Sequence, residues 1–237
     1  MSSSVPEAAR AAPAPRRRAA RGRGPELRGE LLRAATDLLS ETGDVEAMSL
    51  RAVAGRVGVS VPSIYLHFAD KEALLEAVCE EVFEALHARM RAAGEQAPDA
   101  FEGLYAQGMA YVHFALENPE QYRVLMMRRH DGPGADLEIA TGAFGYLVAS
   151  VRACVEQGVL AGEPVALAAR LWAAAHGVAA LLIAKPHFPW PDREAFISDT
   201  ICMAGLGLAA AARLEDTPPG DGMPLPDLVA RLDRLRG

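Results

Sequence analysis

The chain has 237 residues and a formal net charge of −7, and it is 51% hydrophobic but only 6% aromatic. This length can hold a small compact unit beside a larger helical core. No segment alternates apolar and polar residues convincingly over the length of a strand. We therefore expect an all-α fold with about nine helices, a number above that of one small bundle.

Several classes of protein are excluded at this stage. No run approaches the roughly 18–20 uninterrupted apolar residues of a membrane span, and residues 1–24 lack the apolar centre of a secretory signal. We expect a cytoplasmic protein without a membrane partner. The three cysteines, Cys79, Cys154 and Cys202, are far apart and lie within helical patterns, which predicts buried free thiols. Cysteines and histidines lack metal-ligand spacing, and no phosphate loop or nucleophile motif occurs, so no metal, cofactor or enzymatic activity is predicted.

Positive charge is concentrated in an N-terminal arm. Residues 1–28 contain seven arginines and two glutamates, a local charge of +5 that leaves −12 for the remainder. The arm lacks apolar periodicity and should be disordered when free, as any solvated tail would be. An acidic body would still need such an arm to attract DNA phosphates or enter a minor groove. The candidate DNA-binding arginines are Arg16, Arg17, Arg18, Arg21 and Arg23.

The first predicted helix follows this arm. It is marked by an apolar stripe at helical spacing, formed by Leu31, Leu32, Ala35, Leu38 and Leu39. Residues 49–68 then predict two short helices joined by a tight turn. Ser49 suits an N-cap, and Gly58 suits the left-handed residue that ends a helix. Ser60 can cap the second helix, and Pro62 lies in its first turn.

The second short helix has one apolar and one polar side. Ile64 and Phe68, four residues apart, are expected to hold it to the core. Asp70 can cap a third helix directly afterwards. An ordinary helical hairpin is the simplest interpretation, but a short polar-faced helix after a glycine turn is also how proteins present a recognition helix to the DNA major groove.

Residues 27–75 resemble the DNA-binding domain of the tetracycline-repressor (TetR) family of bacterial transcriptional regulators. The match includes Leu50–Ala54, Gly58-Val59-Ser60, Tyr65-Leu66-His67-Phe68 and Lys71–Leu74. The resemblance implies that Val61, Ser63 and Tyr65 face the groove, that Arg51 reads a base edge, and that Tyr65, His67 and Lys71 hold phosphates. The candidate DNA-binding residues of this domain are Ser49, Arg51, Ser60, Val61, Ser63, Tyr65, His67 and Lys71.

Successive helices are predicted beyond residue 75. Their expected ranges are 70–93, 98–116, 119–127, 136–157, 163–184 and 192–214, with a three-proline loop at 185–191. The sequence Trp172-x-x-x-His176-Gly177 is similar to the Trp-His-Gly type of TetR regulatory domain. The last two long helices are apolar almost all round, so a partner must cover one side. Homodimerisation through these two helices is what the resemblance implies.

The expected organisation has four parts. They are a disordered basic arm (1–24), a helix-turn-helix DNA-binding domain (25–75), a helical regulatory and dimerisation domain (76–214), and a C-terminal tail with room for a short helix (215–237). Candidates for lining a ligand cavity are Met109, His113, Met126, Met127, Phe144, Trp172 and His176, although ordinary core packing explains each of them as well.

The resulting hypothesis is a homodimeric transcriptional regulator, most simply a repressor, that leaves a two-half-site DNA operator when an unidentified apolar or amphipathic molecule binds. A ligand-independent DNA-binding regulator, an activator, and a helical small-molecule-binding protein or enzyme are the alternatives. The last of these leaves the recognition helix and the basic arm unexplained.

Overall fold

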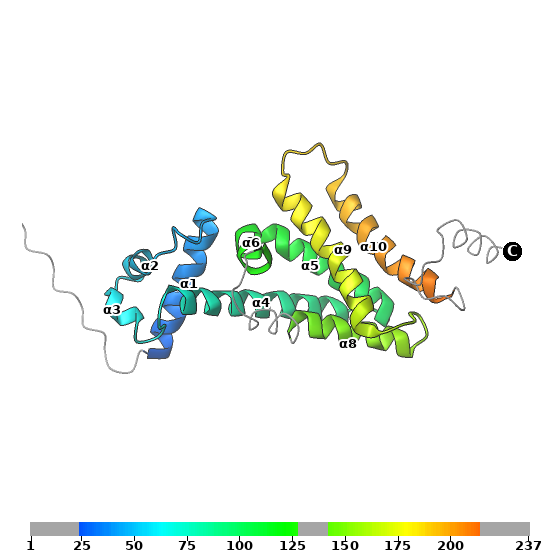
Figure 1. Cartoon of the computed structure of the whole chain (residues 1–237), viewed down its shortest axis with the longest axis horizontal. Coiled ribbons are helices and arrows are strands. Elements are labelled where there is room, and N and C mark those ends of the chain that lie inside the picture. Colours follow the sequence, from blue (N-terminus) through cyan, green and yellow to red (C-terminus); the bar gives the residue numbers. More distant parts are fainter. Residues whose placement is uncertain (1–23, 128–141, 214–237) are drawn as a thin grey trace, which may run out of the picture.

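The computed structural model describes residues 24–127 and 142–213, which contain nine α-helices and no strands. Three helices at one end, α1 (Gly24–Thr42), α2 (Leu50–Val57) and α3 (Val61–Ile64), form a small unit. The long α4 (Lys71–Glu95) runs from this unit into a larger helical body (Figure 1). The all-α prediction is confirmed.

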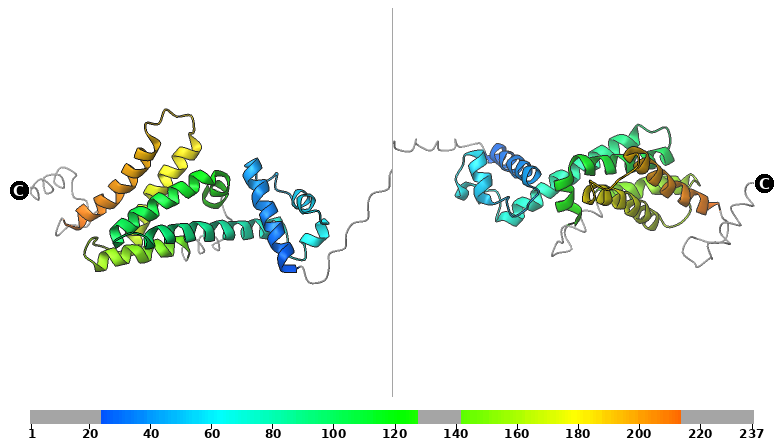
Figure 2. Two further views of the ribbon diagram at one scale, coloured as in Figure 1. Left: turned by 180° about the vertical axis from the view of Figure 1, so that it is seen from behind. Right: turned by 90° about the horizontal axis from the view of Figure 1, so that it is seen from above.

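The larger body is built around α4 and α5 (Ala100–Glu117), which pack against each other. The remaining helices of this body are α6 (Pro119–Met127), α8 (Ala143–Glu156), α9 (Pro164–Ala184) and α10 (Arg193–Ala212). The short α6 reaches back to α1, and α9 and α10 form a neighbouring pair on the outside of the body, as the views in Figure 2 also show.

Acidic N-caps define where four of these helices begin. Carboxylates of Asp70, Asp99, Glu163 and Asp192 accept hydrogen bonds from first-turn amides of α4, α5, α9 and α10. Each cap satisfies amides that have no partner within the helix and places a negative charge at the positive end of the helix dipole. The sequence placed Asp70 correctly, and it predicted the start of α10 to within one residue.

The predicted apolar stripe of the first helix is confirmed. Leu31, Leu32, Ala35 and Leu39 are at most 2% exposed, and Leu38 packs against the same core. This core is continuous, since it extends along α4 through Leu74, Val78, Leu86 and Met90 to side chains of α5, α6, α9 and α10. The small unit and the larger body are therefore joined by one row of buried side chains.

Two expectations differ from the structure, and a third can be compared only in part. The second helix of the helix-turn-helix ends at Ile64, and residues 65–67 continue as turns, with His67 N–H donating to the Ile64 carbonyl at 2.8 Å. Cys202 is exposed, whereas Cys79 and Cys154 are buried as predicted. Helix 136–157 is described only from Ala143, because residues 136–141 lie outside the described ranges.

Leu86 tests the continuous core. Its side chain is fully buried in α4, so Leu86→Ala leaves a cavity and should lower the free energy of unfolding by about 2–5 kcal/mol. Urea denaturation of the whole chain measures this value. The control Glu84→Ala changes an exposed residue of the same helix and should alter stability by no more than about 0.5 kcal/mol. Equal effects of the two substitutions would contradict the assigned core.

Candidate DNA-binding surface and ligand pocket

Local backbone chemistry builds the turn between α2 and α3. Ser49 Oγ accepts from Ala52 N–H at 3.2 Å, which begins α2. Gly58 ends it with φ of 77° and ψ of 28°, a left-handed conformation that is strained for any residue with a Cβ atom. Val59 N–H then donates to the Ala54 carbonyl, which completes the C-cap. The predicted caps at Ser49 and Gly58 are confirmed.

Ser60 occupies the N-cap position of α3 but makes no side-chain cap bond. Its hydroxyl lies 2.8 Å from the Ser63 hydroxyl instead. Pro62 in the first turn has no amide hydrogen, which removes one donor that a cap would otherwise have to satisfy. The expected capping role of Ser60 is therefore wrong, although its position at the helix start is right.

An ion pair fixes the first helix of the motif against α1. The Arg56 guanidinium donates to both carboxylate oxygens of Glu41, at 2.7 and 2.6 Å. This bidentate contact holds the pKa of Glu41 below its usual range and raises the pKa of Arg56. This contact joins α2 to α1.

The outer side of the motif is exposed and carries most of the candidate residues. Arg51 of α2 is exposed, and Tyr65 is 55% exposed just beyond α3. Ser63 and His67 are half-buried along the same stretch. Lys71, in the first turn of α4, has its ammonium 3.4 Å from the Glu46 carboxylate. The structure thus brings together cationic, hydroxyl and aromatic side chains on one segment.

Two apolar residues of this surface differ in their exposure. Val61, which was expected to face the groove, is half-buried and packs partly against the core. Leu66 was not singled out, yet it is 82% exposed between Tyr65 and His67. An apolar side chain exposed to this degree within a recognition surface is suited to contact with a thymine methyl group. Its place inside the Tyr-x-His-Phe motif is the sequence feature that could have identified it.

The arm residues Arg16, Arg17, Arg18, Arg21 and Arg23 lie outside the described residues.

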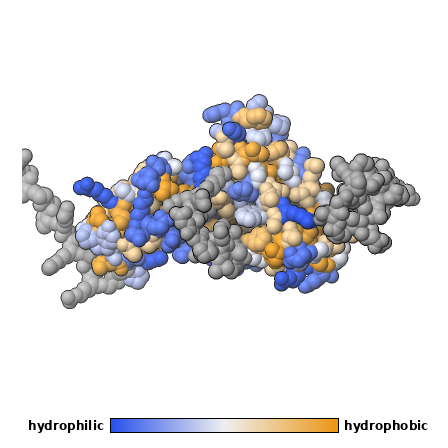
Figure 3. Space-filling model, in the orientation of Figure 1, coloured by the Kyte–Doolittle hydropathy of each residue, from blue (hydrophilic) through white to orange (hydrophobic). Residues whose placement is uncertain are grey.

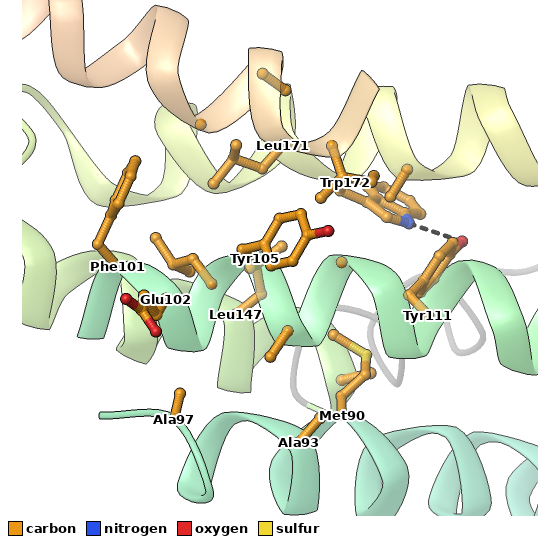
Figure 4. Close-up of a pocket in the computed structure, with 18 of the residues that line it drawn as sticks. Met90, Ala93, Ala97, Phe101, Glu102, Tyr105, Tyr111, Leu147, Leu171 and Trp172 are labelled. Atoms are coloured by element: carbon orange, nitrogen blue, oxygen red, sulfur yellow. Dashed lines mark hydrogen bonds between the residues drawn. The ribbon is translucent and has the colours of Figure 1, made fainter. Parts of the chain in front are cut away.

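The larger body contains a pocket of about 550 Å³ between α4, α5, α8, α9 and α10. Its walls are mainly aliphatic and aromatic, with Phe101 and Glu102 at one end and Trp172 and Tyr111 at the other (Figure 4). This volume lies in the usual range for a small-molecule site. Glu102, which is exposed, is the one charged residue among the described residues that line it.

The structure divides the candidate ligand residues. Met126, Phe144 and Trp172 line the pocket, whereas Met109 packs against the core and His113 bonds to the Glu194 carboxylate at 3.1 Å. His176 lies behind the pocket wall. The side chain of Met127 lies outside the described residues. Sequence reasoning missed Tyr111, because a tyrosine within a helical apolar stripe does not differ from any other core aromatic.

A chain of polar groups runs from the pocket into the core. Trp172 Nε1–H donates to the Tyr111 hydroxyl oxygen at 3.2 Å. The Tyr111 and Tyr122 hydroxyl oxygens are 2.9 Å apart, and the Tyr122 oxygen lies 2.7 Å from His176 Nδ1. We call these four residues the polar chain. Besides this network, the described interior contains the buried side chain of Gln107, which donates to Ser150 Oγ at 3.0 Å.

Burial keeps the members of the polar chain uncharged. It raises the pKa of Tyr111 and, more strongly, the pKa of Tyr122, where the neighbouring Tyr111 adds to the effect. It lowers the pKa of His176, so the imidazole is neutral at pH 7. A neutral imidazole has one donor and one acceptor nitrogen, and Nδ1 can serve as either toward Tyr122.

The helix that carries Tyr122 also contacts the DNA-binding unit. Gln121 Nε2 donates to Ser40 Oγ of α1 at 2.6 Å. Gly43, with φ of +63° after α1, leaves room for the adjacent Glu120 carboxylate, since a Cβ atom there would come within 2.8 Å of Oε2. Arg123 donates to Glu120 and to the Ile183 carbonyl of α9. Consecutive residues of α6 therefore link α1, the polar chain and α9.

The outer helix pair leaves apolar surface uncovered. Met203 and Leu206 of α10 are 71% and 52% exposed, and Leu181 of α9 is 49% exposed. Orange and tan residues are frequent over this part of the molecule (Figure 3). A Cβ atom at Gly177 or Gly207 would meet nothing within 4 Å. Within the described part of the chain, the side of α9 and α10 at these two glycines is therefore open.

Both outer helices are long and apolar enough to cross a membrane, judged by length and composition only. Within the most apolar window, 39% of α9 and 17% of α10 is buried inside the molecule. Core helices of soluble proteins meet the same criterion, and α9 contributes Ala175, Val178 and Ala179 to the core described above.

Comparison with known proteins gives two matches to family models. Residues 31–78 match the model described as bacterial regulatory proteins, tetR family. Residues 104–202, which include Trp172, His176 and Gly177, match a tetracyclin repressor-like C-terminal domain. Together these segments contain the helix-turn-helix, most of the pocket and the polar chain.

Among curated proteins, the chain is 30% identical over 137 residues to the class A tetracycline repressor from transposon 1721 of Escherichia coli, which is 57% of either chain. It is 32% identical over 100 residues to the transcriptional activator FasR of Mycolicibacterium smegmatis, 42% of this chain and 45% of that one. The chain thus spans about half the length of the curated relatives it matches.

Solved structures match a longer part of this chain than the curated proteins do. A Rhodococcus sp. RHA1 protein of unknown function has a TM-score of 0.68 and 28% identity, covering 77% of this chain and 95% of that one. A TetR-family transcriptional regulator of Pectobacterium atrosepticum has a TM-score of 0.61 and 25% identity, covering 80% and 97%. The chain belongs to the TetR family of bacterial regulatory proteins.

Proposed function

We propose that the protein is a cytoplasmic, homodimeric transcriptional repressor whose two helix-turn-helix units bind an operator with two half-sites. Occupation of the pocket by a small apolar or amphipathic molecule releases it from that operator. In this proposal residues 25–75 bind DNA, residues 76–214 bind the ligand and the second subunit, and the protein acts by binding rather than catalysis.

One observation carries the proposal: two helices, α4 and α6, connect the DNA-binding unit to the pocket. Lys71 begins α4 at the DNA-binding end, and Met90 of the same helix lines the pocket. At α6, Met126 lines the pocket while Gln121 bonds to Ser40 of α1. A ligand that moves either helix changes the orientation of the recognition segment.

Dimerisation follows from the uncovered face of α9 and α10. Exposed Leu181, Met203 and Leu206 form apolar surface that a second copy of the same pair can bury. The open space at Gly177 and Gly207 permits close approach of a second backbone. Two-fold symmetry would then place the two recognition segments for half-sites about one helical turn of DNA apart.

Release is best described as a population shift. The protomer samples geometries in which the two recognition segments match or do not match the half-site spacing. A ligand that binds the non-matching geometry more tightly than the matching one shifts the population toward it. The ratio of the ligand's two affinities sets how far the operator affinity can fall. Operator binding must in turn weaken ligand binding by the same factor.

Activation is the second candidate, and one observation favours it. FasR, which resembles this chain over 100 residues, is an activator, so the fold is compatible with either sign of regulation. A ligand-independent regulator is the third. Operator affinity measured with and without a bound ligand, together with reporter transcription from that operator, separates these candidates. Full operator affinity in the presence of a saturating pocket ligand would contradict ligand release.

The first prediction concerns Arg51, which is exposed on α2 and suited to a guanine edge. Arg51→Ala should reduce operator affinity by about 1–3 kcal/mol and relax sequence preference at one position of each half-site. Fluorescence anisotropy with the operator and with single-base variants measures both effects. Arg91→Ala, far along α4, is the matched control and should bind normally. Unchanged discrimination in Arg51→Ala contradicts base reading.

The second prediction concerns Lys71 and its acidic neighbour Glu46. Lys71→Ala should weaken binding to all DNA sequences alike and reduce the slope of log affinity against log salt by about one. Glu46→Gln removes the competing carboxylate and should strengthen binding to operator and random DNA equally. A loss confined to the operator after Lys71→Ala would assign a base-reading role instead.

The third prediction concerns the dimer. Met203→Glu places a charge in the uncovered apolar face of α10, and burying it in a partner would cost several kcal/mol. Sedimentation equilibrium should detect monomers at concentrations where the unmodified protein is dimeric. The control Ala88→Glu changes an exposed position of α4 and should leave the dimer intact. Unaltered association of Met203→Glu would show that another surface mediates dimerisation.

A further inference from the structure

We infer that the pocket selects uncharged, mainly apolar molecules that carry one oxygen function, a hydroxyl or a carbonyl, which hydrogen-bonds to Tyr111. This inference rests on the proposed role of the pocket as the effector site and specifies the ligand. Two features of the pocket support it: the charges in its wall, and the hydrogen-bonding capacity that the Tyr111 hydroxyl has left for a ligand.

The charge of the pocket wall argues against anionic ligands. Among the described residues that line it, none is lysine, arginine or histidine, and the single charged group is the Glu102 carboxylate at one end. A buried carboxylate or phosphate without a cationic partner retains most of its desolvation cost. Glu102 adds repulsion to that cost. An acyl carboxylate is therefore disfavoured, whereas an uncharged molecule of equal size is not.

Tyr111 is the hydroxyl-bearing residue at the end of the pocket opposite Glu102, and Gln96 and Tyr105 also line the wall. The Tyr111 hydroxyl is a member of the polar chain (Figure 4). A phenolic oxygen has one hydrogen to donate and two lone pairs to accept. Trp172 uses one lone pair in every arrangement, because an indole N–H can only donate.

The tautomer of His176 determines whether Tyr111 offers a ligand a free lone pair or a free hydrogen. The Tyr111 oxygen also lies 3.5 Å from His176 Nδ1, a longer contact than the 2.7 Å between the Tyr122 oxygen and the same nitrogen. When Nδ1 accepts, it takes its hydrogen from Tyr122, and Tyr111 donates to Tyr122, so the lone pair that Trp172 does not use is left on Tyr111. When Nδ1 carries the hydrogen, both hydroxyl bonds reverse, and Tyr111 has a spare hydrogen. The first arrangement accepts a ligand hydroxyl, and the second donates to a ligand carbonyl.

The lowered pKa of His176 supports this exchange, because both arrangements require a neutral imidazole. The two tautomers of a free imidazole are close in energy, and the polar chain has the same number of hydrogen bonds in each. The ligand can thus select the arrangement that it needs. Tyr111 therefore recognises an oxygen atom without fixing whether that atom donates or accepts.

Four probes of one chain length test the inference on the full-length dimer: decanol, 2-decanone, decanoate and decyltrimethylammonium. The readout is Trp172 fluorescence in a Trp190→Phe background, which removes the only other tryptophan. Decanol and 2-decanone should both bind, and decanoate should bind at least about tenfold more weakly than decanol. Equal or tighter binding of decanoate or of the cation, or no binding by any probe, would overturn the inference.

Variants then locate the contact. Tyr111→Phe should lower the binding affinity for decanol and for 2-decanone by about three- to tenfold, the loss expected for one hydrogen bond. Tyr105→Phe is the matched control, since it removes another hydroxyl from the same pocket, one that bonds to Ser198 and is not part of the polar chain. It should change neither affinity. Equal losses in the two variants, or no loss in Tyr111→Phe, would contradict recognition by Tyr111.

An infrared measurement does not depend on any substitution. The carbonyl stretch of ¹³C-labelled 2-decanone should move to lower frequency in the protein than in hexane, because Tyr111 donates to it. A hexane-like frequency would contradict the contact. None of these readouts involves DNA, so the inference can fail while operator binding succeeds, and the reverse.

Discussion

The packing of α4 is the constraint on which the rest of the structure depends. One helix buries Leu74 and Leu75 at the end near α1, and Leu86 and Met90 within the larger body. A continuous helix of 25 residues transmits a tilt at one end to the other, because its backbone hydrogen bonds resist local bending. The recognition segment therefore has the orientation that the larger body imposes on α4, and a ligand in that body can act on DNA binding at a distance.

Close to this apolar row, the polar chain and α6 add hydrogen bonds to the connection between the larger body and α1, and the strength of these bonds depends on their direction. Apolar packing tolerates small displacements, whereas hydrogen bonds weaken steeply when their angles change. Tyr122 joins the polar chain, and the residue before it bonds to α1. In the function proposed above, a ligand oxygen at Tyr111 would change the hydrogen-bond pattern of Tyr122 without any charge entering the core. The contact between α6 and α1 includes the hydrogen bond from Gln121 to Ser40, and both helices also contribute side chains to the common core.

The sequence predicts those features that depend on local chemistry. Ser49, Gly58 and Asp70 mark helix ends through caps whose partners lie within five residues, and helix periodicity identifies the buried face of α1. It does not predict contacts between distant segments. The polar chain joins residues of α5, α6 and α9, and its members look like core aromatics until the helices are placed. The expected burial of Cys202 was wrong for the same reason, since its exposure depends on how neighbouring helices pack. The expectation that Val61 faces the groove stays a prediction, since its side chain is half-buried and packs partly against the core.

We propose that two recognition segments, positioned by α4 and related by a two-fold axis, bind one operator. This arrangement can be tested by selecting bound sites from random duplex DNA with the full-length protein and sequencing them. We expect enrichment of an inverted repeat whose half-site centres lie about one helical turn, roughly 10 base pairs, apart or a multiple of that distance. Enrichment of a single unrepeated site, or no enrichment over random sequence, would contradict it.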